Sequence, residues 1–332
     1  MRKGLQIQPR DLDILEAVAE MRFVTVQQMA VLYPSSHADN VVQGAFRGGL
    51  AGLEKRIRKL AADGYLKRLW PASAEKERPP PVFFLGPRSV DALANPNGRG
   101  HNPDKVKQLL RANSKYFSSK STTKQLYIEH RLGINTFHIT LAVALRDHPT
   151  TDWYKTRSGS SFWLEPLAKD SPAKVTVTVK KNAIPEYVKN RIKTTGSQVK
   201  ITRQPDALFA LELNGQRVGF LYEKDRQKEQ LDTIAAKMFT YLEWYKQDHH
   251  QHLFGSSYLR VLFETETEKH MHNMINISLK KVAPAGSSLF WFTTKDNVTL
   301  DNPANVLKPI WIIGHSAYSK NRHSLIEFSH PA

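Results

Sequence analysis

The chain has 332 residues and a formal net charge of +17 at pH 7, with 40% hydrophobic residues, 10% aromatic residues and no cysteine. This composition is typical of a folded protein long enough for two domains, and it excludes disulfides and thiolate metal sites. The sequence contains no signal-peptide pattern and no stretch of about 18 apolar residues. We therefore expect a cytoplasmic protein with no membrane partner.

The positive charge is concentrated in the middle of the chain. The net charge is +5 for residues 1–100, +11 for residues 101–200 and +1 for residues 201–332. Basic surfaces bind polyanions by releasing condensed counterions, so DNA or RNA is the leading partner. The alternative is a basic surface that serves only solubility.

Residues 10–85 have the pattern of a winged helix-turn-helix. Apolar residues at helical spacing follow Pro9, which can occupy the first turn of a helix. Thr25 and Gln28 then form a capping box at the start of a second short helix. A third helix carries one apolar stripe and ends at Asp63-Gly64, and strands at 65–70 and 79–85 follow it.

Cations gather on the third helix and on the strands and loop after it. In a winged helix-turn-helix these elements contact the major groove and the phosphates of duplex DNA. The alternative is a helix that mediates dimer contacts or is simply solvated. We expect the DNA-binding residues to be Arg47, Lys55, Arg56, Arg58, Lys59, Lys67, Arg68, Lys76 and Arg78.

The composition changes after residue 95. Residues 95–103 are rich in Pro, Gly and Asn, and a basic stretch follows them. We therefore expect a winged-helix domain at 1–95, a basic linker at 96–124 and a second domain at 125–332.

An acidic constellation lies in the second domain. Two strands joined by Asn214-Gly215 form a predicted hairpin that begins at Asp206. Side chains alternate along a strand, so Glu223 and Asp225 share one face of the second strand. A helix at 231–245 follows it and carries Lys237.

This order matches the core of PD-(D/E)XK nucleases. The predicted catalytic residues are Asp206, Glu223, Asp225 and Lys237, with the three carboxylates as ligands of Mg²⁺ or Mn²⁺ if the site is active. The motif places Lys two residues after Glu223, where this chain has Asp225, so Lys237 would supply the cation from the following helix. The alternative is a structural network in which the carboxylates pair with Arg226 or Lys237.

The His270-Met271-His272 segment has the His-hydrophobic-His pattern of relaxases and rolling-circle initiators. In those enzymes two His bind a metal and a Tyr attacks the phosphodiester. Residues 264–277 read as a helix, on which side chains two positions apart diverge by about 200°. We therefore do not favour this site.

A series of short motifs follows in order along the chain: Pro9-Arg-Asp-Leu-Asp-Ile-Leu15, Phe23-Val-Thr25, the run from Arg56 to Leu66, Pro205-Asp206, Glu223-x-Asp225-Arg226, Lys237 with Tyr241, and Pro309-Ile-Trp311. Through these motifs, over most of residues 8–311, the chain resembles the replication-relaxation family of plasmid and mobile-element proteins. The resemblance implies a winged-helix N-terminal domain, a restriction-endonuclease-like C-terminal domain and a role in plasmid DNA replication or relaxation. Members of that family carry Glu-x-Asp-Arg in place of Glu-x-Lys.

Together these patterns predict an α/β (α+β) protein, with a winged helix-turn-helix followed by a restriction-endonuclease-like mixed sheet and flanking helices. We expect a duplex DNA-binding protein of a plasmid or other mobile element that acts in replication, relaxation or their control. Its partners would include a second copy of the chain or replication proteins. The alternatives are a metal-dependent nuclease or nickase and a winged-helix transcription regulator.

Overall fold

The chain forms two compact units, Met1–Ile139 and Thr140–Ala332, and the division falls within one long helix. The division expected from the sequence, with domains at 1–95 and 125–332 and a linker at 96–124, stays a prediction. The computed structural model describes residues 5–33, 49–71, 79–95, 100–114, 122–146, 162–164, 174–192, 196–213, 216–227, 229–318 and 320–327.

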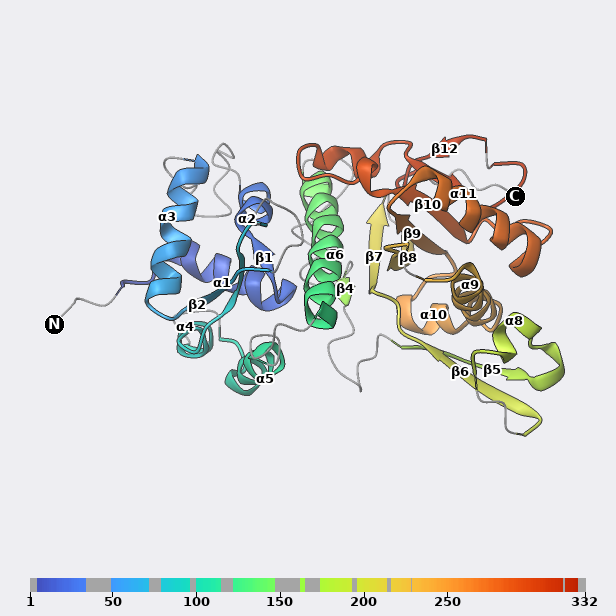
Figure 1. Cartoon of the computed structure of the whole chain (residues 1–332), viewed down its shortest axis with the longest axis horizontal. Coiled ribbons are helices and arrows are strands. Elements are labelled where there is room, and N and C mark those ends of the chain that lie inside the picture. Colours follow the sequence, from blue (N-terminus) through green and yellow to red (C-terminus); the bar gives the residue numbers. More distant parts are fainter. Residues whose placement is uncertain are drawn as a thin grey trace. The chain divides into compact units, whose positions relative to one another are not determined.

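The first unit combines helices with a three-stranded antiparallel sheet of order β1-β3-β2. The capping box between Thr25 and Gln28 is confirmed, because each side chain accepts the backbone N–H of the other residue, at 3.2 and 3.1 Å. Its elements are α1 (Pro9–Met21), β1 (Val24–Thr25), α2 (Val26–Leu32), α3 (Gly49–Ala62), β2 (Leu66–Leu69), β3 (Val82–Leu85), α4 (Ser89–Ala94), α5 (Pro103–Ser114) and the first part of α6 (Thr122–Arg146) (Figure 1).

Polar side chains tie α6 to the start of the chain. The buried Asn135 amide donates to the carbonyl oxygens of Met21 and Phe23, and Gln28 donates to the carbonyl of Leu132 at 2.9 Å. The carbonyls of Met21 and Phe23 lie where α1 ends and β1 begins, so they have no helical partner there. The long helix therefore satisfies the backbone at this connection.

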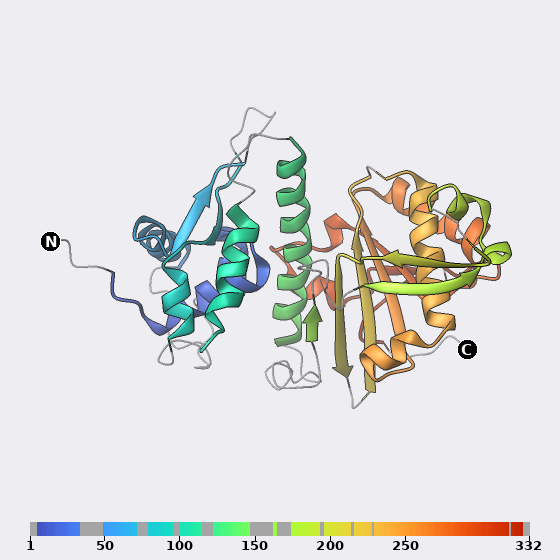
Figure 2. The same ribbon diagram turned by 90° about the horizontal axis from the view of Figure 1, so that it is seen from below.

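The second unit is built on a seven-stranded mixed sheet of order β12-β11-β10-β9-β8-β7-β4. Figure 2 shows strands of this sheet together with helices of the unit. Strands β8, β9 and β10 are parallel to one another, and the strands outside them pair antiparallel. The strands are β4 (Phe162–Leu164), β7 (Ala207–Leu213), β8 (Gln216–Lys224), β9 (Leu259–Thr265), β10 (Phe290–Thr294), β11 (Trp311–Ile313) and β12 (Arg322–His323).

Helices and a separate ribbon complete the second unit. The two strands of the ribbon are β5 (Val175–Lys180) and β6 (Gln198–Arg203), which form their own antiparallel sheet beside α9. The apolar core joins this ribbon, α9, α11 and one face of the large sheet. The helices are α8 (Glu186–Lys189), α9 (Leu231–Lys246), α10 (His249–Phe254) and α11 (Glu268–Ile277), with short 3-10 or π turns at Lys181–Ala183, Ser278–Val282, Lys295–Asn297 and Pro303–Leu307.

The structure confirms the mixed α/β class that the sequence predicts. It also confirms the hairpin strands before and after residues 214–215, although the turn itself lies outside the described residues. Within the described part of the chain, none of the helices combines the length and the apolar character needed to cross a bilayer.

Gly219 in β8 is required by close packing. A Cβ atom at this position would lie 2.4 Å from Cδ2 and 2.5 Å from Cγ of Phe254, the buried last residue of α10. We expect Gly219→Ala to lower the free energy of unfolding by about 1–3 kcal/mol, since the Phe254 ring or the backbone of β8 must shift to admit the methyl group. Chemical denaturation checks this, and the penalty should shrink when Phe254→Leu is also present. An equal penalty in both backgrounds would contradict the packing explanation.

Candidate functional site

The third helix, α3, has one buried and one cationic side. Leu53, Ile57 and Leu60 are buried, as their spacing predicts. Lys55 and Lys59 are exposed on the other side of the helix. A helix of this kind packs on its own domain through one stripe and leaves positive charge available to a polyanion.

Two further cations of α3 have partners in the first unit. Arg58 is exposed and lies 3.2 Å from Glu54 one turn earlier, in a surface pair that contributes little stability. Arg56 instead donates through Nε to Asp11 at 2.7 Å and through Nη2 to the carbonyl of Gln6 at 2.9 Å. The Asp11 carboxylate is fully buried, and its hydrogen bond raises the pKa of Arg56 above the ordinary value.

Arg56 therefore fastens α3 to α1. The sequence groups this residue with the DNA-binding cations, because nothing in the helix distinguishes it from its neighbours. Only 12% of its side chain is exposed, and its donors are directed at Asp11 and the backbone. We leave Arg56 out of the DNA surface proposed below.

Strand β2 adds two exposed cations, Lys67 and Arg68. The guanidinium carbon of Arg68 lies 5.4 Å from the centre of the Trp70 ring, a cation-π contact that orders it at the surface. The remaining predicted DNA-binding residues, Arg47, Lys76 and Arg78, lie outside the described residues.

In the second unit, Glu223 of β8 is the centre of a buried polar cluster. Only 3% of its side chain is exposed. Its Oε2 atom accepts a hydrogen bond from Nζ of Lys237 at 2.9 Å, and its Oε1 atom accepts one from the Tyr241 hydroxyl. Lys237 also contacts Glu229 at 2.9 Å. The structure therefore brings Lys237 of α9 to Glu223, as the sequence predicts, and adds Tyr241.

Asp206 lies immediately before β7 and is bound to the backbone of β8. Its Oδ2 atom accepts the N–H of Lys224 at 2.8 Å, and its own N–H donates to the carbonyl of Tyr222 at 3.0 Å. These two bonds place the carboxylate close enough to Glu223 to influence its charge.

Asp225 has a different set of partners. Its Oδ2 atom accepts a hydrogen bond from the Thr265 hydroxyl at 3.0 Å and lies 2.8 Å from Nε2 of His270, without aligned hydrogen-bond geometry. His270 lies in the first turn of α11 and is partly buried, whereas His272, two residues later, is exposed. The helix thus separates the two His side chains, as the helical spacing predicts.

Burial and charge together set the protonation of the Glu223 cluster. Burial, and to a smaller extent the nearby Asp206, raise the pKa of Glu223 to about 7, although Lys237 and the Tyr241 hydroxyl oppose the shift. Burial lowers the pKa of Lys237, but Glu223, Glu229 and Asp206 outweigh it and raise the pKa overall. One cation thus lies among three carboxylates.

The predicted metal ligands do not fit Mg²⁺ or Mn²⁺ in this arrangement. These ions require several oxygen ligands around one point. Both oxygens of Glu223 are bonded to other side chains, and Asp225 faces Thr265 and His270. Across the part of the chain that the structure describes, no three His, Asp or Glu side chains form a group that could hold a metal ion.

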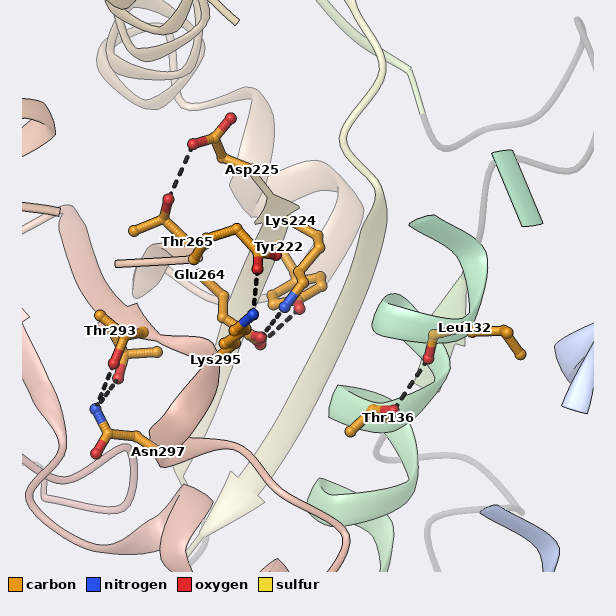
Figure 3. Close-up of polar contacts among 12 residues, drawn as sticks. Leu132, Thr136, Tyr222, Lys224, Asp225, Glu264, Thr265, Thr293, Lys295 and Asn297 are labelled. Carbon is orange, nitrogen blue, oxygen red and sulfur yellow. Dashed lines mark hydrogen bonds and ion pairs between the residues drawn. The ribbon is translucent and has the colours of Figure 1, made fainter. Parts of the chain in front are cut away.

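A second polar cluster, which we did not predict, lies on the other face of β8. Glu264 of β9 is 2% exposed and accepts hydrogen bonds from the Tyr222 hydroxyl at 2.8 Å and from Nζ of Lys224 (Figure 3). The period of two along β8 indicates that Tyr222 and Lys224 share a face opposite Glu223. The sequence does not identify Glu264 as the partner of Tyr222 and Lys224, because β9 lies about forty residues later in the chain.

A family model described as Replication-relaxation matches residues 15–256, which is well over half of the chain. The chain belongs to the replication-relaxation family. Comparisons with curated proteins and with solved structures give no match. The family match includes α3 and the Glu223–Lys237–Tyr241 cluster, whereas the partners of Asp225, Thr265 and His270, lie beyond its end.

In this replication-relaxation protein, the raised pKa of Glu223 should make the free energy of unfolding depend on pH. The pKa of Glu223 rises from an ordinary value of 4.5 to about 7 on folding, so the folded protein holds the extra proton between these values. The stability that protonated Glu223 contributes is fully present below about pH 4.5 and is lost as the pH rises through 7. Between pH 5 and pH 8 we expect the wild type to lose up to about 3 kcal/mol of unfolding free energy relative to Glu223→Gln.

Urea denaturation of both proteins at several pH values measures this difference. Glu229→Gln is the matched control, because Glu229 contacts the same Lys237 from a more exposed position and should leave the pH dependence unchanged. Parallel stability curves for the wild type and Glu223→Gln would show that Glu223 is ionised throughout this range.

Proposed function

We propose that this chain is a duplex DNA-binding protein of a plasmid or another mobile element, acting in DNA replication, relaxation or their control. The observation that carries the proposal is α3, a helix whose apolar stripe is buried and whose opposite side presents exposed cations. Membership of the replication-relaxation family supports the biological setting.

In this proposal the first unit acts as a winged helix-turn-helix. The order of three helices followed by an antiparallel pair of strands supports that assignment. The third helix would enter the major groove, and the cations of β2 and of the segment after it would contact phosphates. The proposed contacts are Lys55, Arg58, Lys59, Lys67 and Arg68, together with Arg47, Lys76 and Arg78.

For the second unit we propose a restriction-endonuclease-like domain that supports DNA binding without cutting DNA. The mixed sheet and the pairing of Lys237 with Glu223 support descent from such a scaffold. The same pairing also makes a nuclease the second candidate, with Asp206, Glu223, Asp225 and Lys237 at its centre. Against cleavage, Glu223 uses both of its oxygens for Lys237 and Tyr241.

The DNA surface of α3 can be tested by the salt dependence of binding. Each phosphate contact contributes about 0.9 to the slope of log K against log salt concentration. We expect Lys55→Ala/Lys59→Ala to reduce the magnitude of that slope on duplex DNA by about 2. Fluorescence anisotropy with a labelled duplex at several salt concentrations measures it.

The control for this measurement is Lys269→Ala/Lys308→Ala, which removes two exposed cations elsewhere in the chain. It removes the same charge and should leave the slope nearly unchanged. Equal slopes for the wild type and the α3 variant would remove α3 from the DNA interface.

Binding without cleavage is the expected result with supercoiled plasmid and Mg²⁺ or Mn²⁺. We expect a mobility shift, no nicked or linear product, and the same behaviour for Glu223→Gln, because both oxygens of Glu223 are already bonded within the protein. Agarose gels read both outcomes. Nicking by the wild type that disappears in a folded Glu223→Gln protein would instead establish the nuclease.

A further inference from the structure

The ribbon of β5 and β6 has two chemically different faces. Its strands pair in antiparallel register, so side chains of paired residues lie on the same side. The inward side is apolar and packs into the core of the second unit, with Val177 opposite Ile201 and Val179 opposite Val199. The ribbon is therefore held rigidly from one side only.

The outward side consists of three polar pairs. Two of its Thr side chains, Thr176 and Thr202, are hydrogen-bonded across the strands at 3.1 Å. The pairs are Thr176 with Thr202, Thr178 with Lys200, and Lys180 with Gln198. Five of these six side chains are exposed and Thr176 is half-buried, so the whole face is available to a partner.

The ribbon and its connection are strongly basic. Residues 174–203 contain eight Lys and Arg residues and one acidic residue, Glu186, a net charge of +7 within a chain of +17. Lys174, Lys180, Lys181 and Lys200 are all exposed. The only acidic residue lies 3.6 Å from Lys189 of its own helix. The outward face thus carries positive charge with no carboxylate on either strand.

We propose that the outward face of the β5–β6 ribbon is a second DNA-binding surface, which contacts duplex DNA. The inference rests on the proposal that the chain binds duplex DNA, but it uses residues and a unit that α3 does not involve. Lys180 and Lys200 contact phosphates, while Thr178 and Gln198 face the groove between them.

The shape and composition of this face favour a duplex over a single strand. A two-stranded antiparallel ribbon fits the major groove of B-DNA, where Lys and Gln side chains can also reach base edges. Single-stranded nucleic acid is held mainly by stacking of its bases on aromatic side chains. The outward face of the ribbon consists of Thr, Lys and Gln, and none of its six residues is aromatic.

The test compares two double variants of the full chain on the same duplex. Lys180→Ala/Lys200→Ala should reduce the magnitude of the salt slope by about 2, as two lost phosphate contacts require. Lys269→Ala/Lys308→Ala, with the same loss of charge, should change it little. A ribbon variant that binds with the wild-type slope would overturn the inference, and so would tighter binding to the isolated single strand than to the duplex.

A photo-crosslinker distinguishes direct contact from a general effect of charge. Thr178→p-benzoylphenylalanine should crosslink to the duplex on irradiation, whereas the same substitution at Lys308 should not. Crosslinking at neither position would also overturn the inference.

These results separate the ribbon from the function proposed for α3. A reduced slope for Lys55→Ala/Lys59→Ala with no effect of the ribbon variant would leave the proposed function intact and remove the second surface. A reduced slope for the ribbon variant with no effect of Lys55→Ala/Lys59→Ala would support the ribbon as a DNA-binding surface and contradict that role for α3. Absence of duplex binding by the unaltered chain would contradict both proposals.

Discussion

The position of β8 inside its sheet, with a paired strand along each edge, is the constraint on which the second unit depends. The strand pairs with β7 on one side and β9 on the other, so its backbone register is fixed on both edges. Alternation then sends Glu223 towards α9 and sends Tyr222 and Lys224 to the opposite face. Gly219 lies in the same strand, and the Phe254 ring occupies the space that a side chain would take. Two polar clusters and one packing contact therefore follow from a single strand.

Each of the two clusters on β8 stabilises a buried carboxylate, but their surroundings differ. Burying an unpaired carboxylate is costly, so each Glu is surrounded by a Lys and a Tyr. Glu264 has Lys224 and Tyr222, whereas Glu223 has Lys237 and Tyr241. Glu223 differs from Glu264 in having the carboxylate of Asp206 close by. Burial first, and the charge of Asp206 second, raise the pKa of Glu223 to about 7 against the opposing effect of Lys237.

Local sequence patterns predicted most of the elements but few of their partners. The capping box of Thr25 and Gln28 and the apolar stripe of α3 depend on residues within one or two turns, and both are confirmed. Arg56 lies 45 residues from Asp11, and its neighbours have the same charge, so the sequence placed it with the surface cations. The Glu264 cluster was missed for the same reason, since β8 and β9 become neighbours only through a crossover. The two-residue strand β1 is too short to give a period and exists because β3 pairs with it.

The two proposed DNA surfaces share one design at the level of secondary structure. In α3 and in the β5–β6 ribbon, an apolar face fixes the element to its own unit, and the period of that element turns the cations outward. Because both surfaces belong to one chain, binding by the first makes the second contact intramolecular. The gain in overall affinity for DNA then depends on the effective concentration of the second surface near the duplex rather than on the affinity of either surface alone. Weak, salt-sensitive contacts on separate units can in this way produce tight binding to a long duplex, while each surface by itself releases DNA readily.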